Sequence, residues 1–282
     1  MQEIIFFLLI PFIALIYEGI YRKVNARIQN RIGPPIIQPF YDILKLFSKK
    51  KLKTQNDPFF KASPFFYFLA TYSLFLFIPL SIIKFEYDFL LLLYLTILSS
   101  AFYILCGLSS DNPFGIVGSM REMVLMIIYE ITLVLSVINF ILKSNVLSLA
   151  DFNSSFLFLS LPLSSLGLIL VCLVELHITP FDTTEAQTEI MAGSKTEYTG
   201  KKLAFLELAT YMKRLFFTFF IPFLIFGKNL TIILPSSFFF LFLYTFLQAT
   251  TSRYRVDQAY KFYIVVMLLV LIEFVLIMRG IL

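Results

Sequence analysis

This chain of 282 residues is too apolar for a soluble protein, because 59% of its residues are hydrophobic, 15% are charged and its mean hydropathy is +0.86. Soluble domains carry roughly 25% charged residues. The net charge of +5 comes from basic residues that flank apolar runs, a pattern typical of membrane topology rather than of nucleic-acid binding. With two cysteines in separate apolar runs and one histidine, we expect no zinc, haem or iron–sulfur site in this chain.

About eight apolar runs are long enough to cross a membrane, which takes about 20 mostly apolar residues. They cover approximately residues 3–21, 64–83, 89–108, 121–142, 158–177, 203–226, 230–251 and 260–281. The first run lacks the basic start and small-residue cleavage site of a signal peptide, so we expect it to be retained. The sequence shows no internal repeat. It predicts an all-α integral membrane protein that forms one polytopic domain over residues 1–282.

The basic residues predict the orientation of these runs. If the runs alternate in direction, nineteen of the 23 Lys and Arg residues lie on the side of the loop between the first two runs. The positive-inside rule then makes this side cytoplasmic and places both termini outside. Arg253 and Arg255, which follow the seventh run, are interpreted as anchors of this topology.

The loop between the first two runs contains a second kind of helix, predicted over about residues 39–50. Phe40, Ile43, Leu44 and Phe47 have helical spacing, and Pro39 suits a first turn. We expect an amphipathic helix that lies at the membrane interface. Just before it, two arginines four residues apart are predicted to share a helix face, where they bind lipid phosphate or line an acidic cavity. These are Arg27 and Arg31.

Several acidic residues lie inside the predicted spans. A charge in the bilayer centre costs a few kcal/mol, so such residues usually face a polar interior and mark ion pathways. Glu130, Glu175 and Glu207 are therefore candidates for a proton path. Glu18 is expected to reach the interface, and Glu273 is expected to pair with a neighbouring subunit.

The loop over about residues 178–202 is rich in acidic residues. If 182–190 is helical, Asp182, Glu185 and Glu189 share one face, where crowding and partial burial would let them take up and release protons near neutral pH. Two simpler interpretations remain open. Asp182 and Glu185 also fit a capping box, and the whole stretch would also be acceptable as a solvated acidic loop.

Three sequence blocks resemble one family. They are ARIQNRIGPPIIQPFYDILKL at 26–46, PFDTTEA at 180–186 with EYTG at 197–200, and the weaker pair GSMR at 118–121 and YE at 129–130. These blocks are similar to the membrane-anchoring subunit that complex I shares with the energy-converting membrane hydrogenases. Bacterial complex I is an NADH–quinone oxidoreductase, and the corresponding mitochondrial protein is NADH dehydrogenase subunit 1.

The resemblance implies a subunit without a redox centre that anchors a peripheral arm and couples its redox chemistry to antiporter-like subunits. It assigns to an acidic path Glu130, Glu175, Asp182, Glu185, Glu189 and Glu197, to which the position of Glu207 in a predicted span adds a seventh residue. It assigns to the arm interface or cavity Arg27, Arg31, Asp42, Lys45 and Arg121.

Departures from the family pattern favour one branch. Only three residues join Gly33-Pro34 to Gln38-Pro39, which is similar to the hydrogenase branch, whereas quinone-reducing members have a longer insertion. Many members carry a glutamate where this chain has Gln187, so one relay carboxylate is missing. His177 and the Thr183-Thr184 pair also differ from the usual pattern.

The leading hypothesis is a coupling subunit of a prokaryotic plasma-membrane complex that is linked to ferredoxin and translocates ions. The complex is of the hydrogenase type or its sulfur-reducing relative. Expected partners are a NiFe-like large subunit, an iron–sulfur small subunit and antiporter-like membrane subunits, and these partners would hold the iron–sulfur clusters and any NiFe site. The alternatives are a quinone-cavity subunit of complex I, a stand-alone secondary transporter and a structural scaffold.

Overall fold

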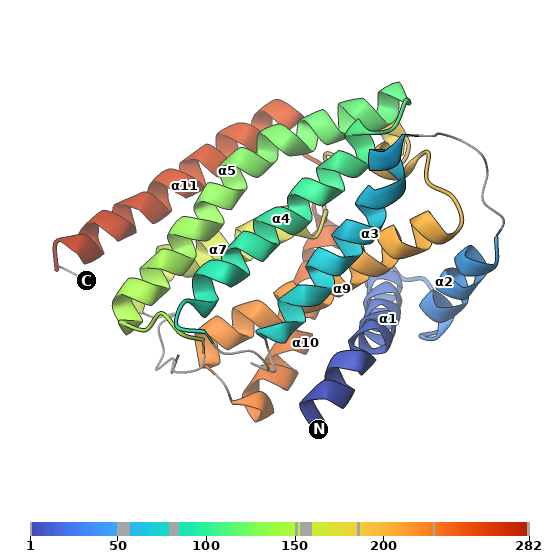
Figure 1. Cartoon of the computed structure of the whole chain (residues 1–282). Coiled ribbons are helices and arrows are strands. Elements are labelled where there is room, and N and C mark those ends of the chain that lie inside the picture. Colours follow the sequence, from blue (N-terminus) through green and yellow to red (C-terminus); the bar gives the residue numbers. More distant parts are fainter. Residues whose placement is uncertain are drawn as a thin grey trace.

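The computed structural model of the chain describes residues 2–49, 57–78, 85–149, 152, 160–184, 187–227 and 229–280 (Figure 1). Every regular element in these ranges is a helix, which confirms the all-α prediction. In chain order the elements are α1 (Gln2–Ile28), α2 (Gln38–Ser48), α3 (Pro58–Ser73), the 3₁₀ helix η1 (Leu74–Leu76), α4 (Asp88–Leu108), α5 (Pro113–Ser144), α7 (Pro162–Glu175), α8 (Gln187–Ile190), the 3₁₀ helix η2 (Gly193–Lys195), α9 (Lys201–Phe226), α10 (Leu230–Thr250) and α11 (Val256–Met278).

The long apolar helices make this chain an integral membrane protein. Within the described ranges, five helices are long and apolar enough to cross a membrane: α4, α5, α9, α10 and α11. The apolar helix α7 is shorter. The number of eight spans, and the side of the membrane that each loop faces, stay predictions. Figure 1 shows both termini at one end of the helix bundle and α2 toward the other.

Several helices differ in length from the predicted runs. Helix α5 begins at Pro113 rather than at 121, because the Asn112 side chain accepts a hydrogen bond from the backbone at the helix start. Asp57 caps α3 in the same way, so that helix begins at Pro58 rather than at 64. Such caps are polar and are invisible to a hydropathy window. The run at 158–177 contains a helix only over 162–175, and residues 158–159 lie outside the described ranges.

The predicted amphipathic helix is confirmed as α2. It packs against α1 and α9 through buried Pro39 and Ile43, while Tyr41 and Leu44 are exposed. An exposed apolar pair beside a packed face suits a helix at a membrane surface. That location stays a prediction.

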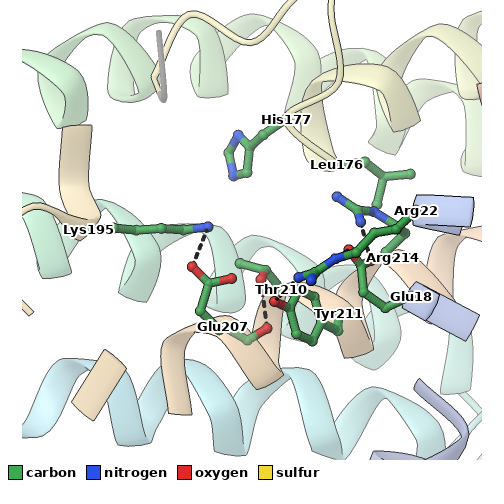
Figure 2. A pocket seen from close by; sticks show the side chains of 9 residues that line it. All are labelled: Glu18, Arg22, Leu176, His177, Lys195, Glu207, Thr210, Tyr211 and Arg214. Atoms are coloured by element: carbon green, nitrogen blue, oxygen red, sulfur yellow. Dashed lines mark hydrogen bonds and ion pairs between the residues drawn. The ribbon is translucent and has the colours of Figure 1, made fainter. Parts of the chain in front are cut away.

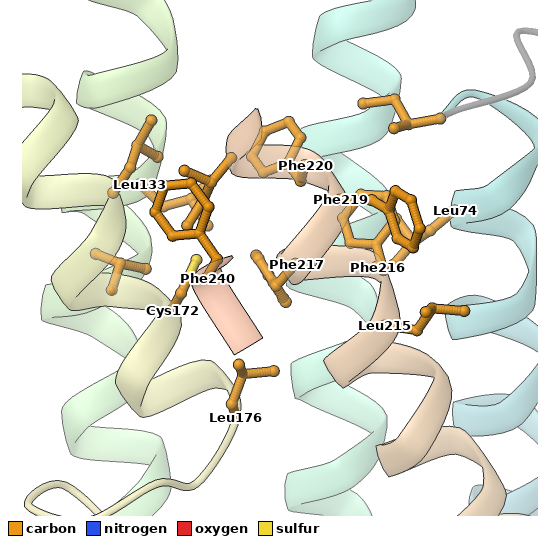
Figure 3. Packing of buried hydrophobic residues seen from close by; sticks show 14 of the residues in the cluster. Leu74, Leu133, Cys172, Leu176, Leu215, Phe216, Phe217, Phe219, Phe220 and Phe240 are labelled. Atoms are coloured by element: carbon orange, nitrogen blue, oxygen red, sulfur yellow. The ribbon is translucent and has the colours of Figure 1, made fainter. Parts of the chain in front are cut away.

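Helix α9 lies at the centre of the structure, in contact with α1, α2, α3, α7 and α10. Its second half carries a run of phenylalanines that packs against Leu74, Leu133 and Phe240 (Figure 3). Phe216 also meets Phe75 edge to face, with ring centroids 5.8 Å apart. Because neighbouring helices surround α9, the polar side chains on its first half are enclosed as well.

Helix α11 is attached to the rest of the structure along one narrow stripe. Its buried residues are Ala259, Tyr263, Val266, Val270 and Glu273, and it packs against α5 and α7. The Glu273 carboxylate accepts hydrogen bonds from the first turn of α7, at 3.2 Å from the backbone nitrogen of residue 163 and 2.6 Å from that of residue 164. The expectation that Glu273 pairs with a neighbouring subunit is therefore wrong, because it caps a helix of its own chain.

Candidate functional site

A buried ion pair lies between α7 and α9. Lys213 Nζ on α9 is 2.5 Å from Glu175 Oε2 at the end of α7, and both side chains are at most 3% exposed. The Ser100 hydroxyl of α4 lies 3.2 Å from Glu175 Oε2 and 3.0 Å from Lys213 Nζ. Three helices thus place a cation, an anion and a hydroxyl together away from water.

Glu130 on α5 adds a second carboxylate to this group. It is 6% exposed, and its oxygens make no hydrogen bond within the described residues. Glu175 and Lys213 are the charged groups that act on it most strongly. The predicted path residues Glu130 and Glu175 are therefore brought together. Because two carboxylates share one ammonium, this group can hold a mobile proton. We call Ser100, Glu130, Glu175 and Lys213 the buried charge cluster.

Two functional residues escape the sequence analysis. Lys213 counts there only as one of the basic residues, although it lies in the middle of an apolar run. Glu122 lies at the edge of a predicted span, yet it is 2% exposed and accepts a hydrogen bond of 3.0 Å from the Tyr129 hydroxyl. One signal could have found Glu122: it precedes Glu130 by eight residues, which places both on the same side of a helix.

A polar cavity of about 220 Å³ opens beside this cluster. Its wall comes from α1, α9, the end of α7 and η2, and Figure 2 shows the side chains that line it: Glu18, Arg22, Leu176, His177, Lys195, Glu207, Thr210, Tyr211 and Arg214. The cavity therefore combines acids and bases with a histidine, and it presents few apolar groups.

Ion pairs fix the acids of this cavity. Glu18 is 4% exposed, pairs with Arg22 at 3.0 Å and also pairs with Arg214. The expectation that Glu18 reaches the interface is wrong, because two arginines neutralise it inside the protein. Glu207 pairs with Lys195 at 3.3 Å, so this predicted path residue lies on the cavity wall.

The acidic loop does not form the expected helix. Residues 182–184 are not helical, and α8 covers only 187–190. Glu185 lies outside the described residues, as does the side chain of Gln187. A reason for the irregular path is the tight packing of Gly193, whose φ is +51° and where an added Cβ would lie 2.0 Å from the Thr184 carbonyl oxygen.

The described acids of this loop bind separate partners. Asp182 pairs with Arg253 at 2.7 Å, Glu189 pairs with Arg121 at 2.6 Å, and the Asn112 amide donates to Glu197 at 2.9 Å. The single acidic face is therefore wrong, and so is the capping role of Asp182. Arg253 fixes the loop in place in addition to any part in topology.

The basic group near the first helix is also rearranged. Helix α1 ends at Ile28, so Arg31 lies beyond it and hydrogen-bonds to Gln29, whereas Arg27 is exposed at the helix end. The shared helix face is therefore wrong. Asp42 pairs with Arg22 at 2.8 Å, and the position of Lys45 on α2 is exposed.

No group of three or more His, Cys, Asp or Glu side chains is placed to hold a metal ion among the residues that the structure describes. The two cysteines, Cys106 and Cys172, are free and buried.

Comparisons with known proteins agree with this architecture. Residues 1–279 match the NADH dehydrogenase family. Hydrogenase-4 component C of Escherichia coli is 32% identical over 241 residues, which is 79% of this chain and 74% of that protein. NADH-ubiquinone oxidoreductase chain 1 of Aedes aegypti is 30% identical over 84% of this chain and 81% of that protein. A subunit of the NADH-quinone oxidoreductase of Helicobacter acinonychis is 29% identical over 85% of this chain and 84% of that protein.

One solved structure shares the whole fold. It is a chain of the membrane-bound sulfane sulfur reductase, an archaeal respiratory membrane complex, with a TM-score of 0.89, 26% identity and coverage of 98% of each chain. These relatives are subunits of multisubunit membrane complexes, so this chain has other subunits as partners. The chain belongs to the NADH dehydrogenase family, as a membrane subunit of complexes of the complex I or hydrogenase type.

Proposed function

We propose that this chain couples electron transfer to ion translocation in a prokaryotic, ferredoxin-linked complex of the membrane-bound hydrogenase type or its sulfur-reducing relative. The chain docks a peripheral arm that contains the iron–sulfur clusters and, in a hydrogenase, the NiFe site. It then relays protonation changes through its buried carboxylates to antiporter-like subunits in the same plasma membrane.

The observation that carries this proposal is the position of the buried charge cluster beside the polar cavity. Lys213 and Arg214 are consecutive on α9, yet Lys213 contacts the cluster while Arg214 lines the cavity. A charge that changes in the cavity therefore acts on the cluster over a short path. At an effective dielectric near 20, a unit charge about 4 Å away is worth roughly 4 kcal/mol, which is enough to move a proton.

Basic residues near the cavity support the docking role. Arg27, Arg31 and Lys45 are exposed. An arm that presents carboxylates would find complementary charges there, and Arg22, held by Glu18 and Asp42, would fix the first helix beneath it.

Two measurements test the proposal. The complex that copurifies with this chain should contain a NiFe-like large subunit and an iron–sulfur small subunit. In sealed vesicles supplied with reduced ferredoxin, Glu130→Gln should lower ion uptake at least about tenfold without changing assembly, because the amide keeps the side-chain size but holds no mobile proton. Glu86→Gln, an exposed glutamate before α4, is the matched control. If Glu130→Gln assembles and pumps normally, the chain is a structural scaffold.

A quinone-binding subunit is the second candidate, because two relatives are named as quinone or ubiquinone oxidoreductases. The cavity argues against this role. It measures about 220 Å³ and is lined mainly by charged groups, whereas small-molecule pockets are usually about 300–1,000 Å³ and mostly apolar. Extraction of the purified complex with organic solvent, followed by chromatography, would detect bound quinone and would favour this alternative.

A further inference from the structure

His177, the single histidine of the chain, lies between the polar cavity and the buried acid Glu122. Its side chain is only 8% exposed, and Figure 2 shows the ring directed toward the space that Lys195 and Glu207 also line. On the inner side, its Nδ1 lies 4.0 Å from Glu122 Oε2. Tyr103 stacks on the ring, with centroids 4.7 Å apart. The imidazole is therefore held between solvent-accessible space and a buried carboxylate.

The backbone at His177 supports a role for the imidazole. The His177 N–H donates to the carbonyl of Val174 at 2.8 Å, and the Ile178 N–H donates to that of Leu173 at 3.0 Å. These two bonds form a Schellman motif that ends α7, and His177 occupies its left-handed position with φ of +50°. Glycine is usual there, because a Cβ is disfavoured in this conformation. A histidine in a conformation suited to glycine points to a use for its side chain.

Glu122 is in turn connected to the buried charge cluster. Its Oε1 accepts a hydrogen bond of 3.0 Å from the Tyr129 hydroxyl. Glu130 and Glu175 also act electrostatically on that hydroxyl. A proton that reaches Glu122 therefore changes the charge beside both cluster carboxylates.

We infer that His177 is a proton-transfer site that carries protons from cavity water to Glu122. This inference rests on the proposed function, and it assigns the point where protons enter the buried charge cluster. Imidazole suits the task because it gains and loses a proton between about pH 5 and 8.

The transfer is balanced and involves no electrons. Hydronium in the cavity gives a proton to the neutral ring. The Nδ1–H bond then breaks as an O–H bond forms on Glu122 Oε2, and the ring returns to its neutral form. The gap of 4.0 Å must shorten to about 3 Å for this step, which a small rotation of either side chain provides. Thr184 Oγ1, at 3.2 Å from Nδ1, holds the ring between transfers.

Both signs of charge face His177 from the surrounding elements. Acids favour its protonated form and bases favour its neutral form, so the balance between them sets the pH at which it responds. The acids are Glu122, Glu18 and Glu207, the bases are Arg22, Lys195 and Arg214, and the neutral titratable groups are Tyr103 and Tyr211.

The test uses the intact complex in sealed vesicles with reduced ferredoxin, and it measures ion uptake and electron transfer from pH 5.5 to 8.5. His177→Asn is the main variant, because asparagine tolerates the left-handed position while it cannot titrate. Uptake should fall about a hundredfold, the lower end of the contribution of a positioned acid–base group. The wild-type pH dependence between about 5 and 8 should also disappear.

His177→Gly provides a second measurement, because it suits the backbone and opens the ring's place to the cavity. Added imidazole should restore uptake in this variant, whereas added acetamide, which does not titrate in this range, should not. The inference is overturned if the assembled His177→Asn complex keeps the wild-type rate and pH profile, or if imidazole fails to rescue an assembled His177→Gly complex. If wild-type vesicles show no ion uptake, the proposed function fails instead.

Discussion

Lys213 offers the sharpest test of the buried charge cluster, through replacement by methionine of similar length. At the observed 2.5 Å and an effective dielectric near 20, its attraction to Glu175 is worth about 7 kcal/mol before desolvation is subtracted. Removal of one partner of a buried pair typically costs about 3–5 kcal/mol, because the other charge stays buried alone. We therefore expect Lys213→Met to lower the free energy of unfolding by about that amount.

A double-mutant cycle separates this loss from simple packing effects. The measurement is unfolding of the full chain in mixed micelles by sodium dodecyl sulfate, followed by circular dichroism. Lys213→Met combined with Glu175→Gln removes both charges, so it should be less destabilised than the sum of the two single variants predicts. A coupling energy below about 0.5 kcal/mol, within the range of independent sites, would refute the pair as an energetic unit.

Two further predictions concern the acidic loop. Arg253→Ala removes the partner of Asp182, so the free energy of unfolding should fall by about 1.5–3 kcal/mol and limited proteolysis should cleave the loop faster; unchanged cleavage would show that the pair does not hold the loop. Gly193→Ala should cost at least about 1–3 kcal/mol because of its positive φ and its close contact with a backbone carbonyl. The matched control is Gly280→Ala, which shares the positive φ but has no neighbour within 4 Å, and equal losses of stability in the two variants would exclude the contact as a cause.

Hydropathy and helical spacing are local properties of the chain, so they predicted the all-α fold and the helix at 38–48. They also identified Glu130 and Glu175, because an acid in an apolar run is unusual wherever the run packs. The partners of charged groups are not local. Asp182 meets Arg253, which is 71 residues away, and no periodicity in the loop encodes that contact. The predicted helix at 182–190 therefore gave way to ion pairs with distant residues.

Lys213 shows a different limit of sequence reasoning. The positive-inside rule treats each lysine as a marker of one membrane side, and it takes no account of a lysine that faces the interior. Glu122 escaped for a related reason, since it lay at the edge of an apolar run and its burial depends on the packing of α5 against its neighbours. In both cases the tertiary arrangement of the helices decides the role.

The seam of α11 has a consequence for how this helix keeps its place in the bilayer. Its inward residues recur at alternating intervals of four and three, the heptad spacing that lets an apolar surface slide by one repeat at little cost. Lipid does not penalise such a slip, because both faces are equally greasy. Glu273 does penalise it, since a displaced carboxylate would lose the amide donors of α7. One acid thus fixes the register of an otherwise interchangeable contact.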